Sequence, residues 1–185
     1  VVTAAVPGRV VLGLRVASVV FRFVVLASLP WLALGLLFVS HLRHLFPPLV
    51  ANCQWWGPVM TRFETTQREV WLTIDDGPDS LHTPRMIELL ARFDARATFF
   101  VIGQKAEKLP NEIARLRDAG QEIANHSYSH PSATFWAYPP RRTAAEIDRH
   151  PVVSRFFRAP AGLNNVFLHP VLARPGLLLG GWRVR

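Results

Sequence analysis

The longest apolar stretch of the chain lies near its N-terminus. Residues 23–40, FVVLASLPWLALGLLFVS, contain no charged side chain. At 1.5 Å per residue a helix of this length spans about 27 Å, close to the thickness of the hydrocarbon core of a bilayer. Pro30 falls within the run, and proline is tolerated in membrane helices because neighbouring groups satisfy the backbone that it frees. We therefore predict a transmembrane helix over residues 23–40.

The charges that flank this run favour a cytoplasmic N-terminus. Arg9, Arg15 and Arg22 precede it, whereas Arg43 follows it, and positive charge collects on the cytoplasmic side of membrane spans. The rest of the chain would then lie on the periplasmic or extracellular side of the cell inner membrane, held by a single span. A cleaved signal peptide, a lipoprotein attached through Cys53 and a buried core helix of a soluble protein are the alternatives.

Further along the chain, short apolar runs alternate with amphipathic segments. The runs predict strands at 70–75, 97–102, 121–125, 156–158 and 177–182. The amphipathic segments predict helices at 83–93, 110–119, 140–149 and 166–174. Strands that alternate with helices indicate an α/β domain with a parallel sheet or barrel. In such folds the functional side chains gather at the carboxyl ends of the strands.

These patterns divide the chain into four segments. They are a basic, interfacial segment at 1–22, the transmembrane helix at 23–40, a linker and the loop that leads into the domain at 41–67, and the α/β domain at 68–185. The first segment carries Arg15 and Arg22 seven residues apart, hence on one helical face, which suits a helix lying along the membrane surface.

The composition of the chain limits the classes of partner and of cysteine chemistry that we expect for the domain. The formal net charge is +8, and the basic residues, nearly all arginines, are scattered through helices and loops. Because no basic stripe is interleaved with aromatic residues, we expect no nucleic-acid binding. Cys53 is the only cysteine, so the chain has neither an intrachain disulfide nor a CxxC metal site.

Five polar side chains lie at or just after the ends of predicted strands. Asp75 ends the first strand and Asp76 follows it in the sequence TIDDGP, His126 and His130 follow the third, and Arg158 ends the fourth. Adjacent side chains of a strand point to opposite sides, so the two carboxylates can take different roles around one point. His126 and His130 are four residues apart, a spacing that would put both imidazoles on one side of a helical turn.

This set of side chains is typical of a metal centre with an acid/base group beside it. Two histidines and one carboxylate form a ligand set that leaves positions open for water and substrate. A divalent metal lowers the pKa of bound water and polarises a carbonyl group, and a second, unligated carboxylate can accept the proton. Arg158 would orient that base through its fork of N–H donors.

Other candidates carry less weight. We expect His82, His150 and His169 on the surface or in turns, because each is isolated in the sequence. Tyr128 and Trp136 are candidates for lining a substrate groove.

In these motifs the chain resembles the polysaccharide deacetylase family, the NodB homology domain of carbohydrate esterase family 4. TIDDGP at 73–78, HSYSH at 126–130 and RAPAG at 158–162 match the first three motifs of the family, and the similarity covers residues 68–182. The resemblance implies a distorted (β/α) barrel with fewer than eight strands, here preceded by the N-terminal transmembrane helix. It further implies Asp75 as catalytic base, with Arg158 positioning it, and as metal ligands Asp76, His126 and His130.

The resemblance also implies a reaction, the metal-assisted hydrolysis of an N-acetyl group on an amino-sugar polymer or glycoconjugate, with release of acetate. Zinc is the expected metal, with cobalt, nickel and manganese as alternatives. The implied partners are a carbohydrate and, through the N-terminal helix, a membrane. The polymer itself is left open among chitin-like oligomers, peptidoglycan, a secreted polysaccharide and a glycolipid.

The chain departs from the family pattern in two places. The connection at 148–156 is shorter than in the family, and the fourth and fifth motifs, including the histidine that protonates the leaving amine, would begin near or beyond residue 180. We therefore expect an incomplete barrel, internally shortened and C-terminally truncated, with strongly reduced catalysis. The alternative is a truncated, membrane-anchored product that binds glycan or metal without turning substrate over.

Overall fold

Two compact units make up the chain, residues Val1–Pro47 and residues Pro48–Arg185. The structure, a computed structural model, describes residues 15–24 and 30–184. The boundary between the units falls at Pro47-Pro48, within the short 3-10 turn η1 (Pro47–Leu49) and inside the linker predicted at 41–67.

The described part of the first unit is helical. Residues 15–24 form one helix, and α2 spans Pro30–Leu45. A proline at the first position of a helix fixes a suitable φ and lacks only an N–H that would have no helical partner. Arg9 and residues 25–29 lie outside the described residues, so the interfacial segment at 1–22 and the helix predicted at 23–40 are described only in part.

The helix α2 continues to Leu45, past the predicted end at residue 40. The prediction ended the helix where the apolar run ends. Polar side chains such as those of His41 and Arg43 end the run but are compatible with a helix, so the helix continues. The ring of His41 lies 2.8 Å from the carbonyl oxygen of Leu37, one turn back. By length and composition the 20 residues Pro30–Leu49 could cross a membrane. An apolar helix near the N-terminus is compatible with an anchor and with a signal sequence.

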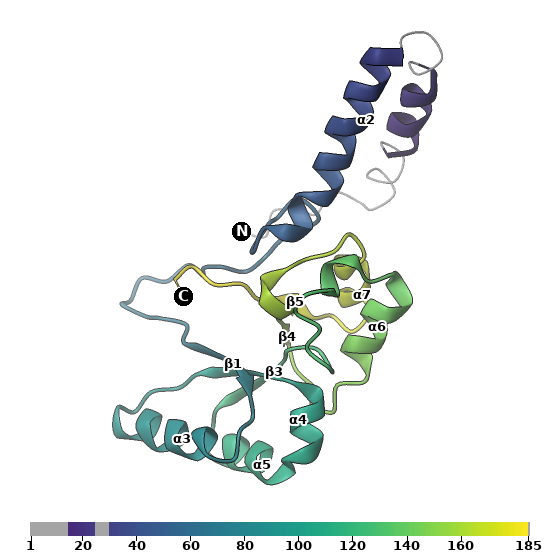
Figure 1. Cartoon of the computed structure of the whole chain (residues 1–185). Helices are drawn as coiled ribbons and strands as arrows, with labels where there is room; N and C mark the ends of the chain where they lie inside the picture. Colours follow the sequence, from purple (N-terminus) through teal and green to yellow (C-terminus); the bar gives the residue numbers. More distant parts are fainter. Residues whose placement is uncertain (1–14, 25–29, 185) are drawn as a thin grey trace. The chain divides into compact units, whose positions relative to one another are not determined.

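The second unit contains a sheet of five parallel strands that follow one another in sequence order (Figure 1). They are β1 (Thr73–Gly77), β2 (Thr98–Val101), β3 (Glu122–Asn125), β4 (Phe156–Phe157) and β5 (Leu178–Leu179). Each overlaps a predicted strand, which confirms the α/β class and the parallel sheet.

Helices connect the strands on the outer side of the sheet. They are α3 (His82–Arg92), α4 (Gly103–Lys108), α5 (Pro110–Asp118), α6 (Pro140–Asp148) and α7 (Leu168–Leu172), with the 3-10 turns η2 (Phe135–Ala137) and η3 (Pro160–Gly162). In Figure 1, α3 and α5 lie side by side near β1 to β3, and α6 and α7 lie together near β4 and β5. The short helix α4 was not predicted, because six residues are too few to show a helical period.

The start of α3 also differs from the prediction. The helix was predicted to begin at residue 83, but it begins at His82, and the carboxylate of Asp79 accepts the backbone N–H groups of Leu81 and His82 at 2.9 and 2.8 Å. Asp79 therefore satisfies donors that have no partner within the helix. The hydroxyl of Thr83 instead accepts the backbone N–H of Asp79, at 2.9 Å.

The two faces of the sheet have different roles, as β2 illustrates. Side chains alternate along a strand, so Phe99 and Val101 pack toward the helices, whereas Thr98 and Phe100 take the inner face. Two apolar clusters fill the outer layer. The first comprises Leu90, Ala97, Phe99, Val101, Ala106, Ile113 and Leu116. The second comprises Val59, Phe135, Tyr138, Ile147, Phe157, Ala159, Leu168, Val171, Leu172 and Leu179.

One of the isolated histidines lies inside the domain. His150 was expected on the surface or in a turn, but it is only 9% exposed. Its Nε2 lies 2.9 Å from the carbonyl oxygen of Val101, and its Nδ1 accepts the N–H of Val152 at 3.2 Å. Burial lowers the pKa of His150, although its contacts with the carbonyl oxygens of Val101 and Val152 partly oppose the shift. By contrast, His82 is exposed, and His169 is partly buried.

The lowered pKa of His150 predicts that the domain loses stability in mild acid. The unfolded chain takes up a proton below about pH 6.5, whereas the folded chain resists protonation. Stability is therefore complete above that pH and falls as the pH drops through the range between the two pKa values. We expect a lower urea midpoint at about pH 5 than at about pH 7.5, and a weaker pH dependence in His150→Gln. Equal pH dependence in the two proteins would contradict this role of His150.

Candidate metal centre

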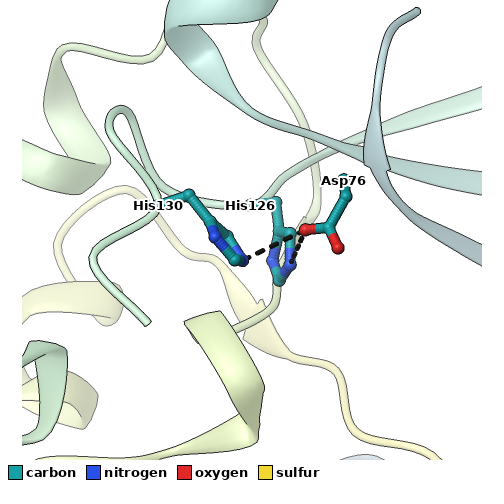
Figure 2. Close-up of side chains that lie close together, drawn as sticks. All are labelled: Asp76, His126 and His130. Carbon is teal, nitrogen blue, oxygen red and sulfur yellow. Dashed lines mark ion pairs between the residues drawn. The ribbon is translucent and has the colours of Figure 1, made fainter. Parts of the chain in front are cut away.

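Three side chains from the carboxyl ends of β1 and β3 lie together (Figure 2). The Oδ1 atom of Asp76 is 3.4 Å from Nε2 of His126 and 3.1 Å from Nε2 of His130. One ligand atom from each residue lies within 4.8 Å of the others. Figure 2 shows both imidazole rings turned toward the carboxylate. The structure thus brings together the three residues that the sequence indicated as metal ligands.

Asp76 reaches this position through a β-bulge. The register between β1 and β2 shifts between Asp75 and Gly77, and Asp76 has a φ of 67°. The left-handed conformation is uncommon for residues with a Cβ, though aspartate tolerates it better than most. Lys105 Nζ donates a hydrogen bond to the carbonyl oxygen of Asp76 at 2.8 Å. The bulge, and not simple strand alternation, therefore aims the Asp76 carboxylate.

The two histidines meet through a loop and not through a helical turn, so that part of the prediction was wrong. Ser127 and His130 both have a left-handed backbone, with φ values of 64° and 54°. Ser127 N–H donates to Oδ1 of Asn125 at 2.8 Å, and His130 N–H donates to Oγ of Ser127 at 3.1 Å. The rings of His126 and His130 end with their centroids 4.7 Å apart.

A hydrogen bond at the ring nitrogen that faces away from Asp76 fixes the orientation of His126. Its Nδ1 lies 2.9 Å from the carbonyl oxygen of Arg158. Because a carbonyl oxygen only accepts, Nδ1 carries a proton, and Nε2 is the ring atom directed at Asp76. Such a hydrogen bond from the second ring nitrogen commonly orients a metal-binding histidine. His126 is 3% exposed, so the ring has little freedom to turn.

Arg158 joins the centre to the neighbouring carboxylate. Its Nη1 donates to Oδ1 of Asp75 at 2.6 Å and to Oγ1 of Thr73 at 2.9 Å, and its Nη2 donates to the carbonyl oxygen of Gly181 at 2.7 Å. The guanidinium lies over the ring of Phe100, 4.0 Å from the centroid. The Arg158 side chain is 2% exposed, whereas that of Asp75 is 31% exposed. Asp75 is therefore held firmly but can still contact solvent.

The family described as polysaccharide deacetylase matches residues 62–177, more than half of the chain. The chain belongs to the polysaccharide deacetylase family. This confirms the resemblance predicted over residues 68–182.

Individual relatives support the assignment. A chitooligosaccharide deacetylase of Sinorhizobium fredii is 35% identical over 130 residues, which are 66% of this chain and 60% of that protein. A peptidoglycan-N-acetylglucosamine deacetylase of Bacillus cereus is 48% identical over 64 residues, 35% of this chain and 23% of that protein. The chain spans less than two thirds of the length of either relative.

A solved structure shows the same fold. It is a family 4 carbohydrate esterase from Streptomyces lividans in complex with acetate, 35% identical with a TM-score of 0.54. The match covers 58% of this chain and 59% of that one.

The electrostatics of this deacetylase-family site favour the protonation states that metal binding needs. The hydrogen bond with His126 lowers the pKa of Asp76, and the charges of His130, His126 and Lys105 add to the effect while burial opposes it. Burial lowers the pKa of His130, and repulsion from His126 adds to the shift. An ionised carboxylate beside a neutral imidazole is the state in which both groups can bind a cation.

The same geometry tests whether a cation fits. With Nδ1 of His126 committed to a carbonyl oxygen, the Nε2 lone pair and the Asp76 carboxylate face each other at 3.4 Å. Two acceptors in this arrangement repel unless a proton or a metal ion lies between them. A third acceptor, Nε2 of His130, faces the same point. The donor set therefore fits a divalent ion with nitrogen and oxygen ligands.

Sequence reasoning missed Lys105, which holds the Asp76 backbone, because it lies on the unpredicted helix α4. Its place four residues after the end of β2 was the available signal, since that position is near the carboxyl end of a strand. Tyr128 donates to Glu107 at 2.9 Å, and Trp136 donates to the carbonyl oxygen of Ala133 at 3.0 Å. A place for either aromatic ring in a substrate groove stays a prediction.

Proposed function

We propose that this chain acts as a metal-dependent deacetylase, hydrolysing N-acetyl groups of an amino-sugar polymer or glycoconjugate. The observation that carries the proposal is the meeting of two groups: the candidate metal centre formed by Asp76, His126 and His130, and the adjacent Asp75–Arg158 pair. The named relatives act on chitooligosaccharide and on N-acetylglucosamine of peptidoglycan, so an N-acetylated amino sugar is the substrate class they share. Acetate, bound in the related esterase, is the expected product.

The metal ligands would be Asp76 Oδ1 and the Nε2 atoms of His126 and His130. Zinc suits two imidazoles and a carboxylate, and cobalt, nickel and manganese are alternatives. A bound ion of this kind supplies an acidified water molecule and polarises the acetyl carbonyl group. The strained backbone at Asp76 and at His130 holds its ligand atoms in place before the ion arrives.

Asp75 would accept the proton of the attacking water. It is not one of the three converging ligands, and it is the part-exposed carboxylate next to them. Arg158 donates to Oδ1 of Asp75, and the second carboxylate oxygen would accept the water proton. Because Arg158 is itself held by Thr73 and Gly181, the base is kept in one orientation. Arg158 is thus the positioning residue of the pair.

Replacing Asp75 and Asp76 separately with asparagine would distinguish the catalytic base from the metal ligand. We expect Asp75→Asn to lower acetate release from N-acetylated chitooligosaccharide by about 10²–10⁴-fold relative to the unchanged chain, with zinc affinity retained. Asp76→Asn should lose both properties. Asp118→Asn, which removes the same charge on the far helix α5, is the matched control. Acetate release and zinc affinity are measured on the same preparations.

These outcomes also address the alternative function. Zinc binding without any acetate release by the unchanged chain would favour a glycan- or metal-binding product over an enzyme. Wild-type acetate release by Asp75→Asn would contradict the assignment of the base.

We also propose that the apolar segment at 23–40 anchors the domain to the inner membrane, with the domain outside the cytoplasm. The domain itself would be a distorted (β/α) barrel. The arginines before the run and the exposed apolar side chains of α2, including Trp31 and Phe38, support this proposal.

For the anchor, we expect the full chain to stay in the membrane pellet after washing with high salt and with alkaline carbonate. Its N-terminal sequence should match that of the translated chain. A shorter soluble product in the periplasm would show instead that the segment is a cleaved signal peptide.

A further inference from the structure

Glu146 of helix α6 contacts the histidine loop through both its side chain and its backbone. Its carboxylate accepts two hydrogen bonds from Ser129, one from the backbone N–H to Oε2 at 2.8 Å and one from the hydroxyl to Oε1 at 2.7 Å. The backbone carbonyl of Glu146 accepts the N–H of Tyr128, at 2.8 Å. Both main-chain donors of the dipeptide 128–129 therefore end on the same residue of α6.

The end of α6 is suited to this contact. The last carbonyl groups of a helix have no partner within it, and Glu146 lies in the last turn of α6. The next carbonyl, that of Ile147, accepts the side-chain amide of Asn125 at 3.1 Å. The N–H of Tyr128 in the histidine loop thus satisfies the carbonyl group of Glu146, whereas the carbonyl oxygen of Ile147 also accepts the N–H of His150 at 3.3 Å.

The position of this contact within the loop matters more than its strength. The dipeptide 128–129 lies between the two left-handed residues, Ser127 and His130. Residues with a Cβ keep this conformation only where the surroundings impose it. From inside the loop, Ser127 accepts the N–H of His130. Ser129, the residue before His130, is restrained by Glu146, which belongs to a separate element, helix α6.

We propose that Glu146 is a positioning residue of the metal centre, which fixes Ser129 so that His130 keeps its Nε2 directed at Asp76. This inference rests on the proposed function, because it assigns to Glu146 a part in preparing that same site. His126 has its own support in the carbonyl oxygen of Arg158. Loss of Glu146 would therefore release His130 and leave His126 in place.

The substitution Glu146→Gln tests this role with little change in size or helix propensity. The two donors of Ser129 bind different oxygens of Glu146; the amide replaces one of them with an NH2 group and removes the charge that strengthens both bonds. We expect the dissociation constant for zinc to rise about 10-fold, as is typical when a partner that orients a metal ligand is lost. In the metal-free protein the imidazole NMR signals of His130 should broaden or shift, while those of His126 stay unchanged.

Glu107→Gln is the matched control. Glu107 accepts a hydrogen bond from the same loop, but from the hydroxyl of Tyr128 and not from the backbone. It removes the same negative charge, so any general electrostatic loss of zinc affinity would occur in both variants. We expect Glu107→Gln to bind zinc as the unchanged protein does.

Ser129→Ala provides a second, milder variant should Glu146→Gln fail to fold. It removes only the bond between the hydroxyl and Oε1, so zinc affinity should fall less. In the double variant the loss should be smaller than the product of the two single losses, because both changes break one shared contact.

Three results would overturn the proposal: unchanged zinc affinity in Glu146→Gln, an equal loss in Glu107→Gln, or equal disturbance of both histidines. Failure of the proposed reaction would look different, since the unchanged protein would then bind zinc but release no acetate.

Discussion

The buried guanidinium of Arg158 is the contact on which the arrangement of the site depends. Arg158 follows β4, whereas Asp75 belongs to β1, and β2 and β3 lie between them. Across a flat sheet the two strands would be roughly 14 Å apart, yet Nη1 of Arg158 lies 2.6 Å from Asp75. The long Arg158 side chain, which lies over Phe100 of β2, covers most of this separation, and curling of the sheet covers the rest. This curl turns the strand ends toward one point and makes a common site possible.

Arg158 also connects the two halves of the chemistry. Its side chain holds Asp75, and its backbone carbonyl holds Nδ1 of His126. Nε2 of His126 thus faces the Asp76 carboxylate at 3.4 Å, where two acceptors repel unless a proton or a metal ion lies between them. The strained backbone is concentrated where the ligand atoms meet, and stability comes from the apolar clusters on the opposite face of the sheet.

The sequence predicted the parts of this structure that depend on local pattern. The strands are short apolar runs, and Asp75, Asp76 and Arg158 follow them directly, so parallel order was enough to bring their ends together. The bulge at Asp76 and the left-handed backbone of Ser127 and His130 were missed, because tertiary contacts impose these conformations. Glu146 and Lys105 act through hydrogen bonds to the backbone, which leave no periodic signal. His150 was misplaced for a similar reason, since a single histidine does not reveal its burial.

The central claim is that Asp76, His126 and His130 form one metal centre within a curled sheet held by Arg158. X-ray absorption at the zinc edge of the zinc-loaded protein tests it most directly, because the first shell reports the ligand atoms themselves. The account predicts two imidazole nitrogens at about 2.0–2.1 Å, with oxygen in the remaining positions. A sulfur ligand at about 2.3 Å, which only Cys53 or a methionine could supply, or a shell without two imidazoles, would contradict it.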